Sequence, residues 1–312
     1  MSLLLVLLVL GYYAYLRWVF EWRDPLLQAP VGTAFRKVGE DTLAYRQLDR
    51  GAKTTVVFVG GLAAWHGSWW RTVEALAAHE KHLNLLALDL PPFGFSLISP
   101  KGGYSRVEQA ARIAGFLQHL NGQKVILVAH SYGAGPAAEV VLADKHHQIG
   151  RFIIIDGVLN VDEVRSESRS LLDIGWLRDL GVGLSVHNNW FVARQIKSFV
   201  YITKHVNGSL VATYTQSFDS QNTTAKLSRW VSDYGHDRLH GPSAKSQNYR
   251  HLKIPVRILW GDHDSLTPLE LTKVLMANIP HAKLEVLKDV GHIPMIENMP
   301  LFDAALRRAI RN

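Results

Sequence analysis

The stretch that decides the fold is "ILVAHSYGAG", residues 126–135. An apolar, strand-like run ends at Ser131, and small residues surround this serine on both sides. Two interpretations fit the pattern. In the first, Ser131 only caps the following helix. In the second, it lies on a sharp, strained turn between strand and helix that exposes its hydroxyl as a nucleophile.

The composition predicts a globular protein. Of the 312 residues, 47% are hydrophobic and 20% are charged, which argues against disorder. This length suits one large α/β domain with an insertion, or two domains. The net charge of +7 comes from scattered lysines and arginines, so nucleic-acid binding is not expected. The absence of cysteine excludes disulfide bonds and thiol catalysis.

The N-terminus predicts a membrane anchor over residues 1–24. The run "LLLVLLVLGYYAYLRWVF", residues 3–20, carries one charge, Arg17, and as a helix it would nearly cross a hydrocarbon core of ~30 Å. A cleaved signal peptide would need basic residues before the run and a small-residue cleavage site after it. The sequence has neither feature. A core helix rarely opens a domain this early. Because Arg17 and Arg23 follow the run, a single-pass protein with its remaining chain in the cytoplasm is favoured.

From residue 33 onward, strand-like and helix-like segments alternate. Continuous apolar strands separated by helices predict an α/β fold with a mostly parallel, twisted sheet and helices on both faces. An aromatic-rich interval interrupts this alternation and predicts a helical cap over residues 158–251, between core segments 30–157 and 252–312. Strands are expected at 33–38, 42–49, 54–61, 83–91, 124–131, 151–156, 256–264 and 283–292, and helices at 72–79, 106–120 and 134–145.

Four of the predicted strands are followed by residues typical of an active site. These are Gly60-Gly61-Leu62, Ser131, Asp264 and His292. The loops that follow parallel strands share one edge of the sheet, so we expect these residues to lie close together.

With these residues in this order, the chain resembles the α/β-hydrolase superfamily over about residues 33–310 and, within it, monoacylglycerol lipases and esterases. The order Ser131, Asp264, His292 is the family's order of nucleophile, acid and base. "DLPPFGFS" (89–96) resembles the family's Asp-x-Pro-Gly-x-Gly-x-Ser segment, and "GHIPMIENMP" (291–300) resembles its Gly-His…Glu-x-x-Pro ending. The chain departs from the pattern at Pro92 and Ala129, where glycine is usual, and at Gly60, where many relatives have histidine.

The resemblance implies a role for each residue and no metal or organic cofactor. Serine needs a base to remove its proton, which is the role of His292. Asp264 would orient the imidazole and stabilise its charged form, with Asp262 and Asp156 as rival acids. The backbone N–H groups of Leu62 and Tyr132 would form the oxyanion hole.

Four side chains are expected to contact the substrate: Trp65, His66, Trp176 and Trp190. For His66, a solvated position explains the sequence equally well. His236 and His240 have the i, i+4 spacing of metal ligands, but no third ligand accompanies them, so a surface pair is the better interpretation.

The predicted function is a membrane-anchored serine hydrolase, a carboxylesterase or lipase that cleaves apolar carboxylic esters such as monoacylglycerols through an acyl-enzyme. The same triad serves amide, thioester and carbon–carbon bond hydrolysis and perhydrolysis, so these stay open. A non-catalytic scaffold with this fold is a further alternative. Epoxide and haloalkane hydrolases of this fold need an aspartate nucleophile, which Ser131 argues against. The sequence leaves the oligomeric state open.

Overall fold

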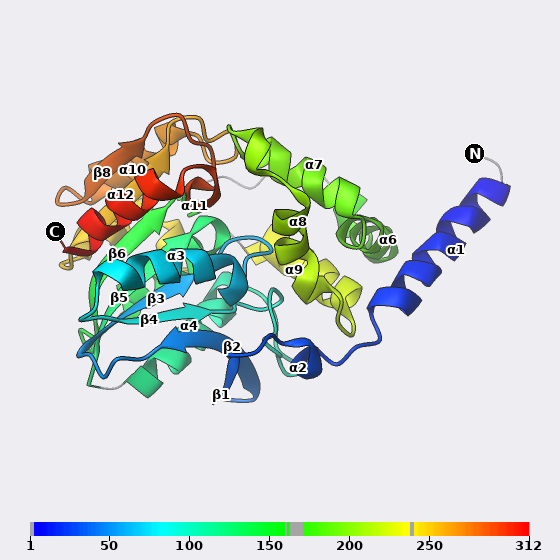
Figure 1. Cartoon of the computed structure of the whole chain (residues 1–312), viewed down its shortest axis with the longest axis horizontal. Coiled ribbons are helices and arrows are strands. Elements are labelled where there is room, and N and C mark those ends of the chain that lie inside the picture. Colours follow the sequence, from blue (N-terminus) through cyan, green and yellow to red (C-terminus); the bar gives the residue numbers. More distant parts are fainter. Residues whose placement is uncertain (1–2, 121, 160, 163–170, 238–239, 312) are drawn as a thin grey trace.

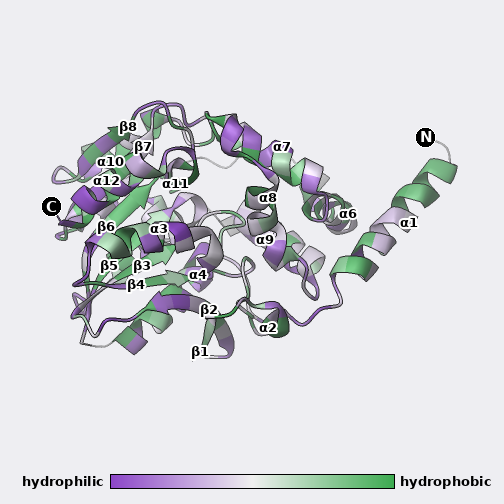
Figure 2. Cartoon of the chain, viewed as in Figure 1, coloured by the Kyte–Doolittle hydropathy of each residue, from purple (hydrophilic) through white to green (hydrophobic). Residues whose placement is uncertain are grey.

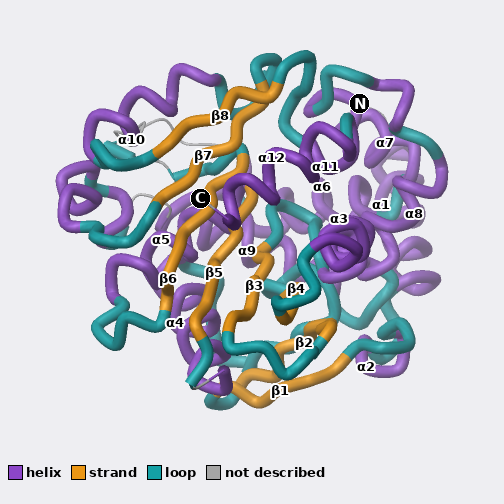
Figure 3. The backbone as a smooth tube through the Cα atoms, turned by 60° about the vertical axis from the view of Figure 1, so that its left-hand side comes forward, coloured by secondary structure: helices purple, strands orange, loops and turns teal. Residues whose placement is uncertain are grey.

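The centre of the molecule is an eight-stranded sheet in the order β1-β2-β4-β3-β5-β6-β7-β8. The computed structural model describes residues 3–120, 122–159, 161–162, 171–237 and 240–311. The β1–β2 and β2–β4 pairs are antiparallel and the remaining pairs are parallel. The strands are β1 Ala34–Val38, β2 Asp41–Leu48, β3 Thr54–Val59, β4 Asn84–Leu88, β5 Lys124–His130, β6 Ile149–Ile155, β7 Val256–Gly261 and β8 Lys283–Leu287 (Figures 1 and 3).

Helices cover both faces of this sheet, because alternate residues of each central strand are apolar on both sides. In β3, Val56 and Phe58 pack against α3 (His66–His79) and α12 (Met299–Arg311), whereas Val57 and Val59 belong to the core on the opposite face. The opposite face is covered by α4 (Arg106–Leu117), α5 (Ala134–Ala143) and α10 (Thr272–Asn278). Figure 2 shows the strands as mainly hydrophobic and the surrounding helices as mixed. The predicted fold class is confirmed.

A group of helices lies between β6 and β7 in the sequence, and we call the described residues 171–237 the helical insertion. Its helices are α6 (Gly175–Val186), α7 (Asn189–Phe199), α8 (Gly208–Thr215) and α9 (Thr223–Asp237). They lie together at one end of the sheet (Figure 1). The remaining short helices are α2 (Pro25–Gln28), before the sheet, and α11 (Pro294–Glu297), just before α12.

The N-terminal helix α1 (Leu3–Phe20) corrects one prediction. In the part of the chain that the structure describes, no helix combines the length and the apolarity needed to cross a membrane. The predicted single-pass anchor over residues 1–24 is therefore wrong. The membrane localisation and the cytoplasmic orientation inferred from Arg17 and Arg23 fall with it.

The far end of α1 packs against the helical insertion. Leu16 is buried, and the Phe20 ring stacks on the His187 ring with centroids 5.0 Å apart. Just beyond α1, the Glu21 carboxylate accepts hydrogen bonds from His187 and Thr224. The C-terminal end of α1 and the residue that follows it are therefore attached to the helical insertion.

Candidate active site

The turn after β5 holds Ser131 in a strained conformation. Ser131 has φ +50°, in the left-handed region that non-glycine residues rarely adopt. The N-cap position of α5 is occupied by Gly133, so Ser131 is not the cap of that helix. Gly61 approaches the turn so closely that a Cβ at this position would lie 2.7 Å from the Ser131 Cβ. The turn at Ser131 is therefore strained, and Gly133 within the stretch is crowded as well, since a Cβ there would clash with the Gly60 carbonyl oxygen.

Ser131, His292 and Asp264 form one hydrogen-bonded chain across three loops. The Ser131 Oγ lies 2.8 Å from the His292 Nε2, and the His292 Nδ1 lies 2.7 Å from the Asp264 Oδ2. All three residues are buried. In this arrangement the imidazole can accept the serine proton on one side while the carboxylate holds its Nδ1–H on the other.

Asp264 is held as a carboxylate. Burial on its own raises the pKa of Asp264, but hydrogen bonds from His292 and Thr267 outweigh burial and lower the pKa below its ordinary value. The Asp264 Oδ1 accepts the backbone N–H groups of Leu266 and Thr267, each at 2.8 Å. These donors fix the carboxylate in the orientation that meets His292.

The two rival acids have other environments. Asp156, at the end of β6, accepts the Gly261 N–H at 2.8 Å through Oδ1. Burial and the nearby charge of Asp264 raise the pKa of Asp156 well above its ordinary value. Asp262 is paired with His263 and Lys288, outside the chain formed by Ser131 and His292.

Leu62 and Tyr132, the residues predicted to form an oxyanion hole, both lie next to the Ser131 turn. Leu62 follows Gly61, which contacts the Ser131 turn, and Tyr132 follows Ser131 itself. Within the described residues, neither backbone N–H is taken by a protein acceptor, so both are available to an incoming oxygen. The Tyr132 side chain points away from this site, where its hydroxyl accepts a hydrogen bond from Gln109 at 3.1 Å.

His130 supports the loop that carries His292. Because the His292 backbone oxygen can only accept, the His130 Nε2–H donates to it, at 2.8 Å. Burial, together with the neighbouring His292, lowers the pKa of His130 to about 3. The His130 ring is therefore neutral at physiological pH.

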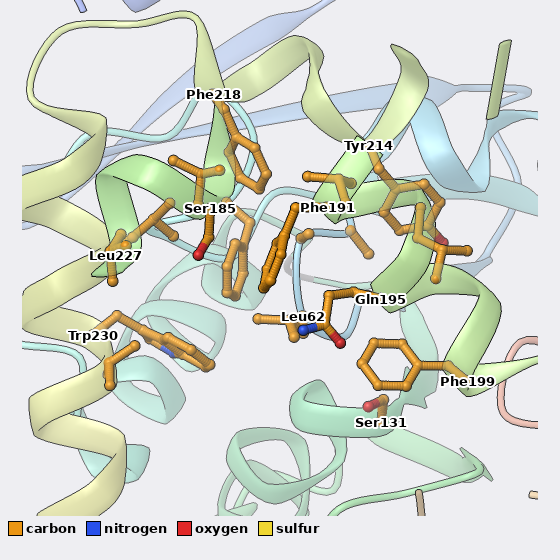
Figure 4. Close-up of a pocket in the computed structure, with 18 of the residues that line it drawn as sticks. Leu62, Ser131, Ser185, Phe191, Gln195, Phe199, Tyr214, Phe218, Leu227 and Trp230 are labelled. Carbon is orange, nitrogen blue, oxygen red and sulfur yellow. The ribbon is translucent and has the colours of Figure 1, made fainter. Parts of the chain in front are cut away.

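A cavity of about 540 Å³ opens beside Ser131, between the loops of the sheet and the helical insertion. Figure 4 shows Ser131 at one side of it, with side chains of α7 and α9 around the rest. Among the described residues that line the cavity, none is Lys, Arg, Asp or Glu. The walls are mainly aliphatic and aromatic: they include Leu62, Val182, Val186, Phe191, Phe199, Phe218, Leu227 and Trp230.

The helical insertion is fastened to the loop of His292. The His292 N–H donates to the Phe199 carbonyl at the end of α7, at 2.9 Å. The buried Glu297 carboxylate accepts the N–H groups of Tyr201 and Ile202 from the insertion and that of Gly291 from the loop. The two segments therefore share a single anchoring carboxylate.

The structure does not bring the four predicted substrate contacts to the cavity. Trp176 and Trp190 are 69% and 70% exposed and do not line it. Trp65 is buried, with its Nε1 donating to the Thr213 carbonyl at 2.7 Å. His66 is neither solvated nor in the cavity, since it is buried and its ring bonds Asp89 and Thr33.

The lining residues that the sequence interpretation missed share a helical spacing. Phe191, Gln195 and Phe199 lie four residues apart on α7, so they occupy one face of that helix and enter the cavity together. Trp190, the neighbour of Phe191, lies off this face. Helical phase groups these three residues on one face of α7, but it does not indicate that this face is the one that meets the cavity.

Comparison with known proteins finds relatives that cover most of this chain. An uncharacterized hydrolase of Bacillus subtilis is 22% identical over 263 residues, which cover 80% of this chain and 87% of that protein. A 2-hydroxy-6-oxo-2,4-heptadienoate hydrolase of Pseudomonas putida is 29% identical over 262 residues, covering 80% of this chain and 86% of the relative. The crystal structure of a putative lipase from Acinetobacter baumannii superimposes with a TM-score of 0.72 at 18% identity, covering 95% of this chain and 94% of the other.

The family model described as "alpha/beta hydrolase fold" matches residues 54–299, which is most of the chain and includes the loops of Ser131, Asp264 and His292. This protein therefore belongs to the alpha/beta hydrolase family, and its relatives include hydrolases.

Proposed function

We propose that this protein is a serine hydrolase that cleaves apolar carboxylic esters. One observation carries the proposal: the Ser131 hydroxyl, hydrogen-bonded to His292, faces a cavity whose described lining contains no Lys, Arg, Asp or Glu. A nucleophile beside apolar walls suits a substrate with a long hydrocarbon part.

In the proposed reaction, the Ser131 Oγ attacks the ester carbonyl carbon while His292 takes the serine proton. The carbonyl oxygen becomes an oxyanion and is stabilised by the N–H groups of Leu62 and Tyr132. When the tetrahedral intermediate collapses, the C–O bond to the alcohol breaks and His292 gives its proton to that alcohol. Water then attacks the acyl-serine with His292 as base, releasing the carboxylic acid and restoring Ser131. Asp264 stabilises the imidazolium in both steps.

The chemistry of the cavity also favours esters over the anionic substrate in the Pseudomonas relative's name. A heptadienoate carries a carboxylate, and burying a carboxylate without a cation or several donors is costly. The described lining offers no lysine or arginine to pair with it. An uncharged acyl chain has no such requirement, and a cavity of about 540 Å³ can accommodate one of medium length.

The test is hydrolysis of p-nitrophenyl esters from acetyl to palmitoyl by the full-length protein and its Ser131→Ala variant. We expect turnover that is greatest for medium or long acyl chains and falls at least ~10⁴-fold in Ser131→Ala, because the nucleophile is lost. Ser209→Ala, at an exposed position of α8, serves as the matched control and should keep full activity.

Two results would contradict the proposal. Undiminished turnover in Ser131→Ala would exclude this serine as the nucleophile. The absence of turnover with every ester, in a protein whose Ser131 still reacts with a fluorophosphonate, would move the assignment to amide, thioester or carbon–carbon substrates.

A further inference from the structure

The cavity face of α7 contains one polar side chain. The residues of this helix that line the cavity are Phe191, Val192, Gln195, Ile196 and Phe199, and all except Gln195 are apolar. A primary amide carries two donor hydrogens and an acceptor oxygen, so it offers an uncharged substrate group both kinds of hydrogen bond. Among the described lining, Gln195 is therefore the one residue of α7 that can offer a side-chain hydrogen bond inside the cavity.

Gln195 lies on the His292 side of the cavity. It precedes Phe199 by four residues, which places it one helical turn away on the same face. The Phe199 ring packs edge-on against the His292 ring, with centroids 6.3 Å apart. Figure 4 shows the Gln195 amide pointing into the cavity that Ser131, Leu62 and Phe199 also line.

The Gln195 amide is available for binding. Within the described part of the chain, it forms no hydrogen bond with another protein group, and the residue is exposed at the cavity. Ser185, another polar residue of the lining, differs because its hydroxyl already donates to the Gly181 carbonyl at 2.6 Å. An amide without a protein partner gains a hydrogen bond when a polar substrate group reaches it.

The mechanism decides which part of the substrate meets Gln195. His292 must protonate the leaving alcohol, so this alcohol has to lie beside the His292 imidazole. Gln195 is one turn from the residue that packs on that imidazole, whereas the apolar wall of Val182, Val186, Leu227 and Trp230 comes from α6 and α9. The acyl chain suits the apolar wall, and the alcohol suits the α7 side.

We propose that Gln195 is a specificity-determining residue that hydrogen-bonds a free hydroxyl on the alcohol part of the ester. The preferred substrate class is then an acyl ester of a polyol, with glycerol as the simplest example, over an ester of a simple alkyl alcohol. This inference rests on the proposed ester hydrolysis. Because the described lining holds no lysine or arginine, it favours a neutral polyol over an anionic head group.

The experiment compares kcat/KM for 1-decanoylglycerol and methyl decanoate in the full-length protein and in Gln195→Leu, which keeps the size and removes the amide. We expect the decanoylglycerol value to fall about three- to tenfold, as for one lost hydrogen bond, while the methyl ester value stays within about twofold. Lys197→Leu, at an exposed position of α7 that does not line the cavity, should change neither value.

The outcomes separate the two proposals. Equal changes for both esters in Gln195→Leu, or no change for either, would overturn the role of Gln195 while leaving ester hydrolysis in place. If neither ester is cleaved in a Ser131-dependent manner by the unmodified protein, the proposed function itself fails.

Discussion

The edge of the sheet and the helical insertion meet at one cavity but are built in opposite ways. At the edge, Ser131, His292 and Asp264 are buried and hydrogen-bonded to one another. On the insertion side, the wall is largely apolar, and its one amide on α7 has no protein partner within the described residues. The side chains at the edge thus have hydrogen-bond partners without a ligand, whereas the Gln195 amide of the insertion can gain one from a bound ligand.

This difference indicates a division of labour. If the proposed reaction takes place at the sheet edge, its groups need to be fixed before the substrate arrives, and strain and hydrogen bonds hold Ser131, His292 and Asp264 in place there. Selection among substrates needs shape and a few polar contacts, which a set of helices can change without disturbing the sheet. Changes at the edge should therefore alter the rate for every ester, and changes in the insertion should alter the ranking of esters.

The largest expected effect concerns the two carboxyl groups at the sheet edge. Asp264→Asn should lower kcat about 10³- to 10⁴-fold for all esters, because an amide cannot stabilise the imidazolium. Asp156→Asn should cost less than about tenfold, since Asp156 bonds the Gly261 N–H and does not bond His292. Steady-state kinetics with acetyl and decanoyl esters measures both. A severe loss in Asp156→Asn beside a mild one in Asp264→Asn would assign the acid to Asp156.

A smaller effect is expected in the insertion. Val186→Trp enlarges a side chain of the α6 wall, so kcat/KM for long acyl chains should fall about tenfold or more while acetyl esters are nearly unaffected. The profile of p-nitrophenyl esters by chain length measures this shift. The matched control is Val31→Trp, at a position that is 97% exposed. A uniform loss of kcat/KM across all chain lengths would contradict the idea that the insertion sets the preference among esters and not the overall rate.

The smallest effect concerns stability, through His130. In the unfolded chain a histidine titrates near its ordinary pKa of about 6.5, whereas in the folded protein the pKa is about 3. Between these values the unfolded state binds the extra proton, so this group lowers the free energy of unfolding by up to about 1.4 kcal/mol for each unit that the pH falls. Above pH 6.5 the contribution is constant.

Urea unfolding between pH 7 and pH 4.5 measures this slope. His130→Gln removes the titrating group and should flatten the acid side of the curve relative to the unmodified protein. His82→Gln, at a side chain that is 72% exposed, is the control for losing an imidazole. An unchanged slope in His130→Gln would show that other groups dominate acid unfolding, and that the sheet edge is not the pH-sensitive part.

The division also explains which features the sequence predicts. The strands and the loops that follow them depend on continuous apolar runs and on chain order, and the structure brings Ser131, Asp264 and His292 together as expected. Asp264 could be preferred over Asp156 only through resemblance, because both follow a strand. Burial and hydrogen bonding, which lower the pKa of Asp264 and raise that of Asp156, depend on the folded chain.

The lining of the cavity could not be predicted in the same way. Trp176 and Trp190 are the conspicuous residues of the insertion, yet both point to solvent. Which face of α7 meets the cavity depends on how the helix is seated against the sheet, and periodicity alone does not supply that. The wrong prediction of a membrane anchor has a similar cause, since an apolar run in the sequence does not reveal that Leu16 is buried against the protein.

The carboxylate of Glu297 has a consequence for protein engineering. It bonds Tyr201 and Ile202 of the insertion and Gly291 of the histidine loop, while the Phe199 carbonyl holds His292 directly. A chimera that exchanges α6–α9 for the helices of another hydrolase would therefore lose these hydrogen bonds if its crossover fell within residues 199–202. Chimeras that keep residues 199–202 of this protein should preserve the position of His292. These four residues are therefore suitable boundaries for exchanging the helices that would set substrate selectivity.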